Sequence, residues 1–84
     1  VMDQVAWAMG CDPLDVRYAN LYAPGRDVTP YGMPVEETDT LPALMRSLER
    51  SSEYRERREA IRAFNAGSPV IKRGLALTPV KFGI

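Results

Sequence analysis

The last thirteen residues of the chain carry a hydrophobic pattern with a period of two. Apolar residues fall first at odd and then at even positions: Leu75, Leu77 and Pro79, then Val80, Phe82 and Ile84. This alternation predicts a β-strand over residues 72–84, with a bulge or bend where the phase slips by one residue. Proline has no N–H to donate, so Pro79 suits such a bend. Because no partner strand is evident in the chain, we predict that this strand joins a sheet outside it.

Two short helices are predicted at the start of the chain. Apolar residues recur every four positions through residues 1–9, and Gly10 suits the left-handed conformation that ends many helices. Asp12 is a favourable N-cap and Pro13 a favourable first residue for a second helix over residues 13–21. The chain must therefore turn sharply between the two helices.

Two longer helices are predicted in the second half of the chain. They follow an irregular stretch over residues 23–40, in which residues 35–38 are predicted to form a short edge strand. The third helix starts at Thr40, a suitable N-cap. An apolar stripe on this helix is expected to bury one face: Leu41, Leu44, Met45 and Leu48. A pair of serines interrupts the pattern, and the fourth helix is predicted over residues 53–65.

The predicted fold class is α+β, a mostly helical segment of about four helices with one C-terminal strand that joins a sheet outside the chain. In this interpretation residues 1–84 are a single segment or subdomain of a larger domain. No N-cap precedes Val1 and no initiator methionine is present, which favours an excised or processed segment.

Composition limits the classes of function. The 84 residues allow one domain with a small core, and 45% of them are apolar, as in ordinary globular proteins. Eleven basic residues balance eleven acidic ones, which argues against a nucleic-acid or anionic-membrane partner. The single cysteine, Cys11, excludes an internal disulfide and favours a reducing cytoplasm.

Candidate catalytic and metal-binding groups are few. The chain has no histidine, which removes the usual catalytic triads and zinc sites. We interpret Cys11 as a structural residue rather than a reactive thiol, and Glu36, Glu37 and Asp39 as a solvated loop rather than a hard-metal site. Four aromatic residues are expected to pack in a core or interface rather than on a ligand: Trp7, Tyr18, Tyr31 and Phe82. No catalytic, cofactor-binding or metal-binding residue is therefore assigned.

The most conspicuous polar feature is the charged run from Glu53 to Arg62. Its spacing predicts three helical ion pairs, each worth about 0.2–0.5 kcal/mol: Glu53–Arg57, Arg55–Glu59 and Glu59–Arg62. We interpret the run as a solvated helix face. An RNA- or phosphate-binding helix is disfavoured because the acidic residues would cancel its field. A subunit interface is the remaining alternative.

Four stretches of sequence are specific when taken in order. They are GCDPLDVRYANLY at residues 10–22, TPYG at 29–32, FN at 64–65, and KRGLA followed by PVKFGI at 72–84. In order and spacing they resemble the G-x-D-P-x-x-V-R-x-x-N, F-N, K-R-G and P-x-K-F-G-I motifs of one enzyme family. This is the molybdenum-binding large subunit of the xanthine dehydrogenases and aldehyde oxidases. The ending is closest to the bacterial xanthine dehydrogenase-like branch.

The resemblance implies a parent that is a molybdenum-dependent oxidoreductase of the cytoplasm. Such enzymes hydroxylate a purine, a related N-heterocycle or an aldehyde with oxygen from water, using molybdopterin-bound molybdenum, iron–sulfur clusters and FAD. The implied partners are the rest of the molybdenum-binding domain, the iron–sulfur and FAD subunits or domains, and a second copy of the parent. The family's catalytic glutamate and cofactor loops have no counterpart among residues 1–84, so we expect this segment to bind no cofactor.

Two hypotheses of function follow. In the first, the chain is a structural segment without catalysis of its own, which joins two parts of the molybdenum domain. In the second, it is an independent small helical protein–protein interaction module that docks through the apolar stripe of residues 41–48.

Overall fold

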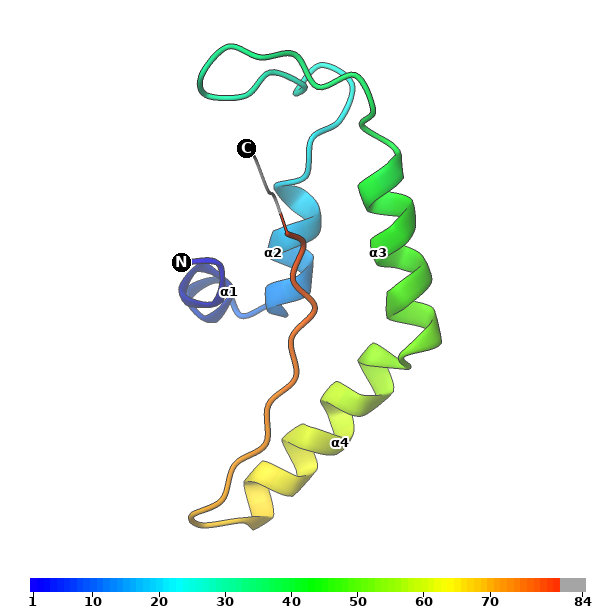
Figure 1. The fold of residues 1–84 in the computed structure, drawn as a ribbon. Coiled ribbons are helices and arrows are strands. Elements are labelled where there is room, and N and C mark those ends of the chain that lie inside the picture. The colour runs from blue at the N-terminus through cyan, green and yellow to red at the C-terminus, as the bar shows by residue number, and fades with distance from the viewer. Residues whose placement is uncertain (81–84) are drawn as a thin grey trace.

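Residues 1–80 are described by the computed structural model, and they contain four helices. These are α1 (Met2–Met9), α2 (Pro13–Ala19), α3 (Thr40–Ser51) and α4 (Tyr54–Gly67). In Figure 1, α3 and α4 form a bent rod along one side, while α1 projects on the other side of α2. All four helices were predicted, although α2 ends two residues earlier and α4 two residues later than expected.

Local signals set the turn between α1 and α2. Gly10 ends α1 in the left-handed conformation, with a φ of 70° that a residue lacking Cβ adopts without strain. Its N–H donates to the Trp7 carbonyl at 3.3 Å. The Asp12 side chain then accepts the Leu14 N–H at 2.8 Å, and Pro13 opens the helix. Both predictions for this turn are confirmed.

The junction between α3 and α4 is a sharp elbow at Ser52 and Glu53. Glu53 adopts a left-handed φ of 52°, which is uncommon for a residue with a side chain. At the other end of α3, the N-cap position belongs to Asp39, not to Thr40 as predicted, and its side chain makes no capping bond. The elbow lets α4 turn across the start of α2.

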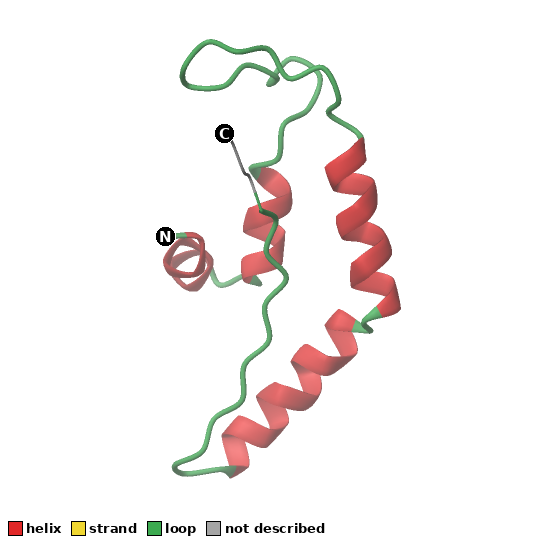
Figure 2. Ribbon diagram, viewed as in Figure 1, coloured by secondary structure: helices red, strands yellow, loops and turns green. Residues whose placement is uncertain are grey.

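The predicted C-terminal strand is wrong for the part that the structure describes. Residues 68–80 form no strand, and neither do residues 35–38 (Figure 2). A strand needs a ladder of backbone hydrogen bonds to a neighbour, and residues 1–80 contain only two isolated bridges, both within the loop before α3. The alternation reflects extended backbone, because Leu77 is buried while Ala76 and Thr78 are exposed. Val80 is exposed, whereas Phe82 and Ile84 lie outside the described residues.

A small core joins α2, α3, α4 and the C-terminal segment. Its buried members come one from each: Leu14, Met45, Tyr54 and Leu77. The predicted stripe on α3 is buried only in part, since Met45 is 2% exposed whereas Leu44 and Leu48 are 62% and 49% exposed. The fold is therefore mostly helical, with its core on one side of α3.

The C-terminal segment is tied to the end of α4 by a feature we call the Asn65–Arg73 clasp. The Arg73 N–H donates to Asn65 Oδ1 at 2.8 Å, and Asn65 Nδ2 donates to the Arg73 carbonyl at 3.0 Å. The Arg73 guanidinium lies 3.8 Å from the centroid of the Phe64 ring, within cation–π range. From this clasp the segment runs back beside α4 toward α2 (Figure 1).

The molecule is elongated and exposes much surface. Its extents are 47 × 27 × 25 Å and its radius of gyration is 15.5 Å, against about 12 Å for a compact domain of this length. Its accessible surface is 6660 Å², against about 5,000 Å² for a folded monomer of this mass. None of the four helices is long and apolar enough to cross a membrane.

Candidate functional site

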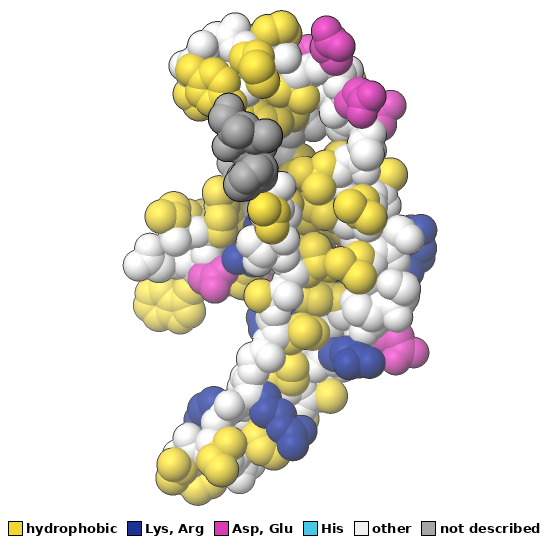
Figure 3. Space-filling model, viewed as in Figure 1, with side chains coloured by type: hydrophobic (Ala, Val, Ile, Leu, Met, Phe, Trp, Pro, Cys, Tyr) yellow, Lys and Arg dark blue, Asp and Glu magenta, His cyan; other side chains and the backbone are white. Residues whose placement is uncertain are grey.

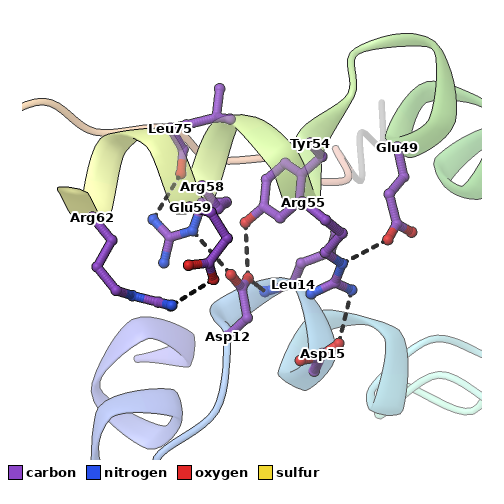
Figure 4. Close-up of polar contacts among 10 residues, drawn as sticks. All are labelled: Asp12, Leu14, Asp15, Glu49, Tyr54, Arg55, Arg58, Glu59, Arg62 and Leu75. Atoms are coloured by element: carbon purple, nitrogen blue, oxygen red, sulfur yellow. Dashed lines mark hydrogen bonds and ion pairs between the residues drawn. The ribbon is translucent and has the colours of Figure 1, made fainter. Parts of the chain in front are cut away.

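The most concentrated polar chemistry lies where α4 crosses the start of α2 (Figure 4). There Asp12 uses both carboxylate oxygens. Asp12 Oδ1 accepts the Tyr54 hydroxyl at 2.8 Å as well as the Leu14 N–H, and Oδ2 accepts Arg58 Nε at 2.9 Å. Arg58 also reaches the Leu75 carbonyl, at a long 3.5 Å. One carboxylate thus caps α2 and anchors α4.

A second arginine makes a parallel bridge one turn earlier on α4. Arg55 donates from Nε to Glu49 of α3 at 2.8 Å and from Nη2 to Asp15 of α2 at 2.9 Å. Glu49 in turn accepts the Tyr18 hydroxyl at 2.7 Å. Together with Asp12, Tyr54 and Arg58, these residues form what we call the junction network.

The network shifts the pKa values of its members. Burial alone would raise the pKa of Asp12, but bonds from the Leu14 N–H, Tyr54 and Arg58 together lower it. The bond from Tyr18, followed by that from Arg55, lowers the pKa of Glu49. Burial and a bond to a carboxylate raise the pKa of Tyr18 and of Tyr54 to about 12. Both carboxylates are therefore held charged and both phenols neutral.

An open groove beside the network has no net charge to select a ligand. Its volume is about 680 Å³, and three arginines and three glutamates line it along with Tyr18: Arg46, Arg50, Arg55, Glu49, Glu53 and Glu56. The opposite charges alternate and partly pair. The arrangement is suited to holding helices together.

One polar atom is left without a partner between α1 and α2. Arg17 Nη2 donates to Asp3 at 2.8 Å, but Nη1 is buried and has no hydrogen-bond partner among the described residues. A buried donor without an acceptor costs about 1–3 kcal/mol. The contact between α1 and α2 thus leaves one buried donor unsatisfied among the described residues.

The other candidate groups remain apart from the junction network. Cys11 is exposed. Glu36, Glu37 and Asp39 lie in the loop before α3, and the described residues hold no group of three potential metal ligands. Trp7 and Tyr31 are largely exposed, at 88% and 68%, so neither packs in the core of the described residues, and their packing in an interface stays a prediction. Tyr18 packs against the core, and Phe82 lies outside the described residues.

Only one of the three ion pairs predicted for the charged run is present in the described part of the chain. The Glu59–Arg62 ion pair is present, but no ion pair joins Glu53 to Arg57 or Arg55 to Glu59 within residues 1–80. Arg55 and Arg58 instead bond to α2 and α3. Their partners lie too far away in sequence to be inferred from helical spacing; only the capping role of Asp12 pointed to this junction.

Comparisons with known proteins give a consistent set of relatives. The chain is 33% identical to a xanthine dehydrogenase of Blastobotrys adeninivorans over 81 residues, or 96% of its length. It is 34% identical to a nicotinate hydroxylase of Emericella nidulans over all 84 residues. It is 38% identical to aldehyde oxidase 1 of Cavia porcellus over 81 residues, again 96% of the chain. No protein-family model and no solved structure matches it.

The chain resembles a segment of the xanthine dehydrogenase and aldehyde oxidase family. It spans only 6% of the length of each of these three relatives. The expected resemblance is therefore confirmed, and it covers the chain almost completely.

Nothing in the described part of the chain shows binding of the molybdopterin-bound molybdenum that the resemblance implies for the parent. The described residues offer no cluster of His, Cys, Asp and Glu as ligands. The arginines of the junction network, Arg55 and Arg58, are already bonded to carboxylates and are not free to hold a pterin phosphate.

Proposed function

We propose that this chain is a structural segment of a larger molybdenum hydroxylase, in which it positions neighbouring parts of the molybdenum-binding domain and performs no catalysis of its own. One observation carries the proposal. The relatives match the chain over nearly all its length, while the chain spans 6% of theirs.

The elongated shape of the molecule is consistent with a structural segment of a larger protein. Its accessible surface of 6660 Å² exceeds that of a monomer of the same mass by roughly one third. Such an excess is expected of a piece whose apolar surface is covered by other parts of a protein. The strongest polar contacts, at Asp12, Arg55 and Arg58, are internal and join helices rather than face a ligand.

For the parent we propose the chemistry that the family resemblance implies. It would hydroxylate a purine, a related N-heterocycle or an aldehyde with oxygen from water. Molybdopterin-bound molybdenum, iron–sulfur clusters and FAD would be held elsewhere in the protein or its complex, and the parent would form a homodimer in the cytoplasm. A reducing compartment suits the free, exposed Cys11.

The second candidate is the independent interaction module, which the exposed Leu44 and Leu48 of α3 favour. In that case Leu44→Asp or Leu48→Asp would abolish binding of a partner without unfolding the chain. Unfolding would instead show that these leucines stabilise the fold.

The test is the intact mass and metal content of the protein from which the chain derives. We expect a subunit of much higher mass that carries molybdenum. A stable, metal-free protein of 9.4 kDa would overturn the proposal and favour the interaction module.

A further inference from the structure

Helix α1 exposes apolar side chains on opposite sides, although Asp3 and Gln4 lie about 40° and 60° from Trp7 around the helix. Seven of residues 1–9 are apolar, yet only Ala6 is buried. Val5, Trp7 and Met9 are 39%, 88% and 72% exposed. With 3.6 residues per turn, Trp7 lies about 160° around the helix from both Val5 and Met9. Apolar side chains therefore stand on opposite sides of α1, as on the projecting part of the molecule in Figure 3.

The polar residues of α1 would not oppose enclosure by protein. Its only charged side chain, Asp3, is already paired with Arg17 of α2 at 2.8 Å, and Gln4 is uncharged. Covering α1 would therefore isolate no charge within the helix. A helix with exposed apolar side chains on opposite sides approaches the pattern of helices enclosed in the interior of a large protein.

We propose that α1 is enclosed on at least two sides by apolar surface of the remainder of the parent polypeptide. This inference rests on the proposed function, and it identifies the face through which the segment is held. A second copy is a poorer occupant, because a two-fold contact pairs one patch with itself and would leave the opposite side of α1 exposed. The relatives, of which the chain spans 6%, supply ample polypeptide for the enclosure.

Hydroxyl-radical oxidation of the intact source protein tests the enclosure, with Trp7 and Met9 as reporters. Oxidation rates are read by mass spectrometry on the native protein and again after denaturation in urea. If the exposure of Trp7 falls from 88% to below about 5%, its native rate should be at least about tenfold slower than its denatured rate. Native rates close to the denatured ones would overturn the inference.

Two further measurements separate the possible outcomes. If the slow oxidation of Trp7 and Met9 is lost when the protein is diluted, the surface that covers α1 belongs to a second copy. That result would overturn enclosure by the parent polypeptide. The intact mass of the same sample keeps the two proposals distinguishable. A large subunit with unprotected Trp7 contradicts only the enclosure, whereas a protein of 9.4 kDa contradicts the proposed function itself.

A pair of substitutions in the source protein gives an independent check. Trp7→Glu would place a charge in the enclosed surface and should strongly reduce the yield of assembled protein, whereas Trp7→Phe should preserve it. Equal yields for both variants would contradict the enclosure. Arg57→Glu on the exposed face of α4 is the matched control for a change of charge.

Discussion

Asp12 is the residue on which the largest number of elements depends. Its carboxylate ends the turn after α1, caps α2 and receives both Tyr54 and Arg58 from α4. Because its side chain is only 13% exposed, these bonds are shielded from water and worth more than surface ion pairs.

Replacing Asp12 should therefore loosen α2. Asp12→Asn keeps a capping oxygen but removes the charge, and it should lower the free energy of opening α2 by about 1.5–3 kcal/mol. Asp12→Ala also removes the cap and should cost about 1 kcal/mol more. Native-state hydrogen exchange of the α2 amides in the source protein measures both. The control is Asp15→Asn, whose half-exposed ion pair should cost less than about 1 kcal/mol; equal effects at both positions would contradict the central role of Asp12.

The phenol of Tyr54 should report the same junction at high pH. Burial and the bond to Asp12 raise its pKa to about 12, above the ordinary value of about 10. A pKa that is higher in the folded state stabilises the fold at pH values below 10, and this contribution is lost as the pH rises toward 12. We expect absorbance titration of the source protein to show a late tyrosinate step that Tyr54→Phe reduces by one phenol, because the pKa of Tyr18 is also raised to about 12. A titration curve unchanged by this substitution would contradict the assignment.

Among the elements, the elbow between α3 and α4 holds backbone strain. Glu53 has a φ of 52°, and its side chain makes no capping bond. Glu53→Gly should relieve the left-handed strain and raise stability by about 0.5–1.5 kcal/mol. The matched control, Glu56→Gly inside α4, should lower stability by about 1 kcal/mol. Thermal unfolding of the source protein compares the two variants, and a loss of stability in both would show that the elbow is unstrained.

The helices could be predicted because their ends are set locally. Gly10 and the Asp12–Pro13 pair terminate and restart the chain through contacts within a few residues. A C-terminal strand could not be predicted from local signals in the same way. Its alternation of apolar residues reports extended backbone, but pairing depends on a neighbour, and Leu77 packs against helices instead.

The contacts of the junction network could not be predicted either, because they join residues that are far apart in sequence. Arg58 and Asp12 are separated by 46 positions, and helical spacing instead favoured pairs within α4. The expected Arg55–Glu59 pair is replaced because Arg55 bonds to Asp15 of α2 and Glu49 of α3. Sequence pattern therefore located the cap at Asp12 but not its partners.

At the scale of the whole molecule, the isolated 84-residue chain should not unfold cooperatively. It buries a small core and exposes roughly one third more surface than a monomer of its mass. Circular dichroism on heating should show a gradual loss of helix rather than a sigmoidal transition. A sharp transition would indicate a self-sufficient fold and would favour the interaction module.

The Asn65–Arg73 clasp has a consequence for how the chain tolerates insertions. Two backbone-to-amide bonds and the stacking on Phe64 fix the position from which the C-terminal segment departs. Residues inserted between Ser68 and Arg73 would only enlarge an exposed loop, which costs about 0.6 kcal/mol per doubling of its length. One residue inserted between Arg73 and Leu77 would turn the buried leucine outward, since neighbouring side chains of an extended backbone point in opposite directions. Natural variants should thus differ in length before Arg73 and keep a constant length after it.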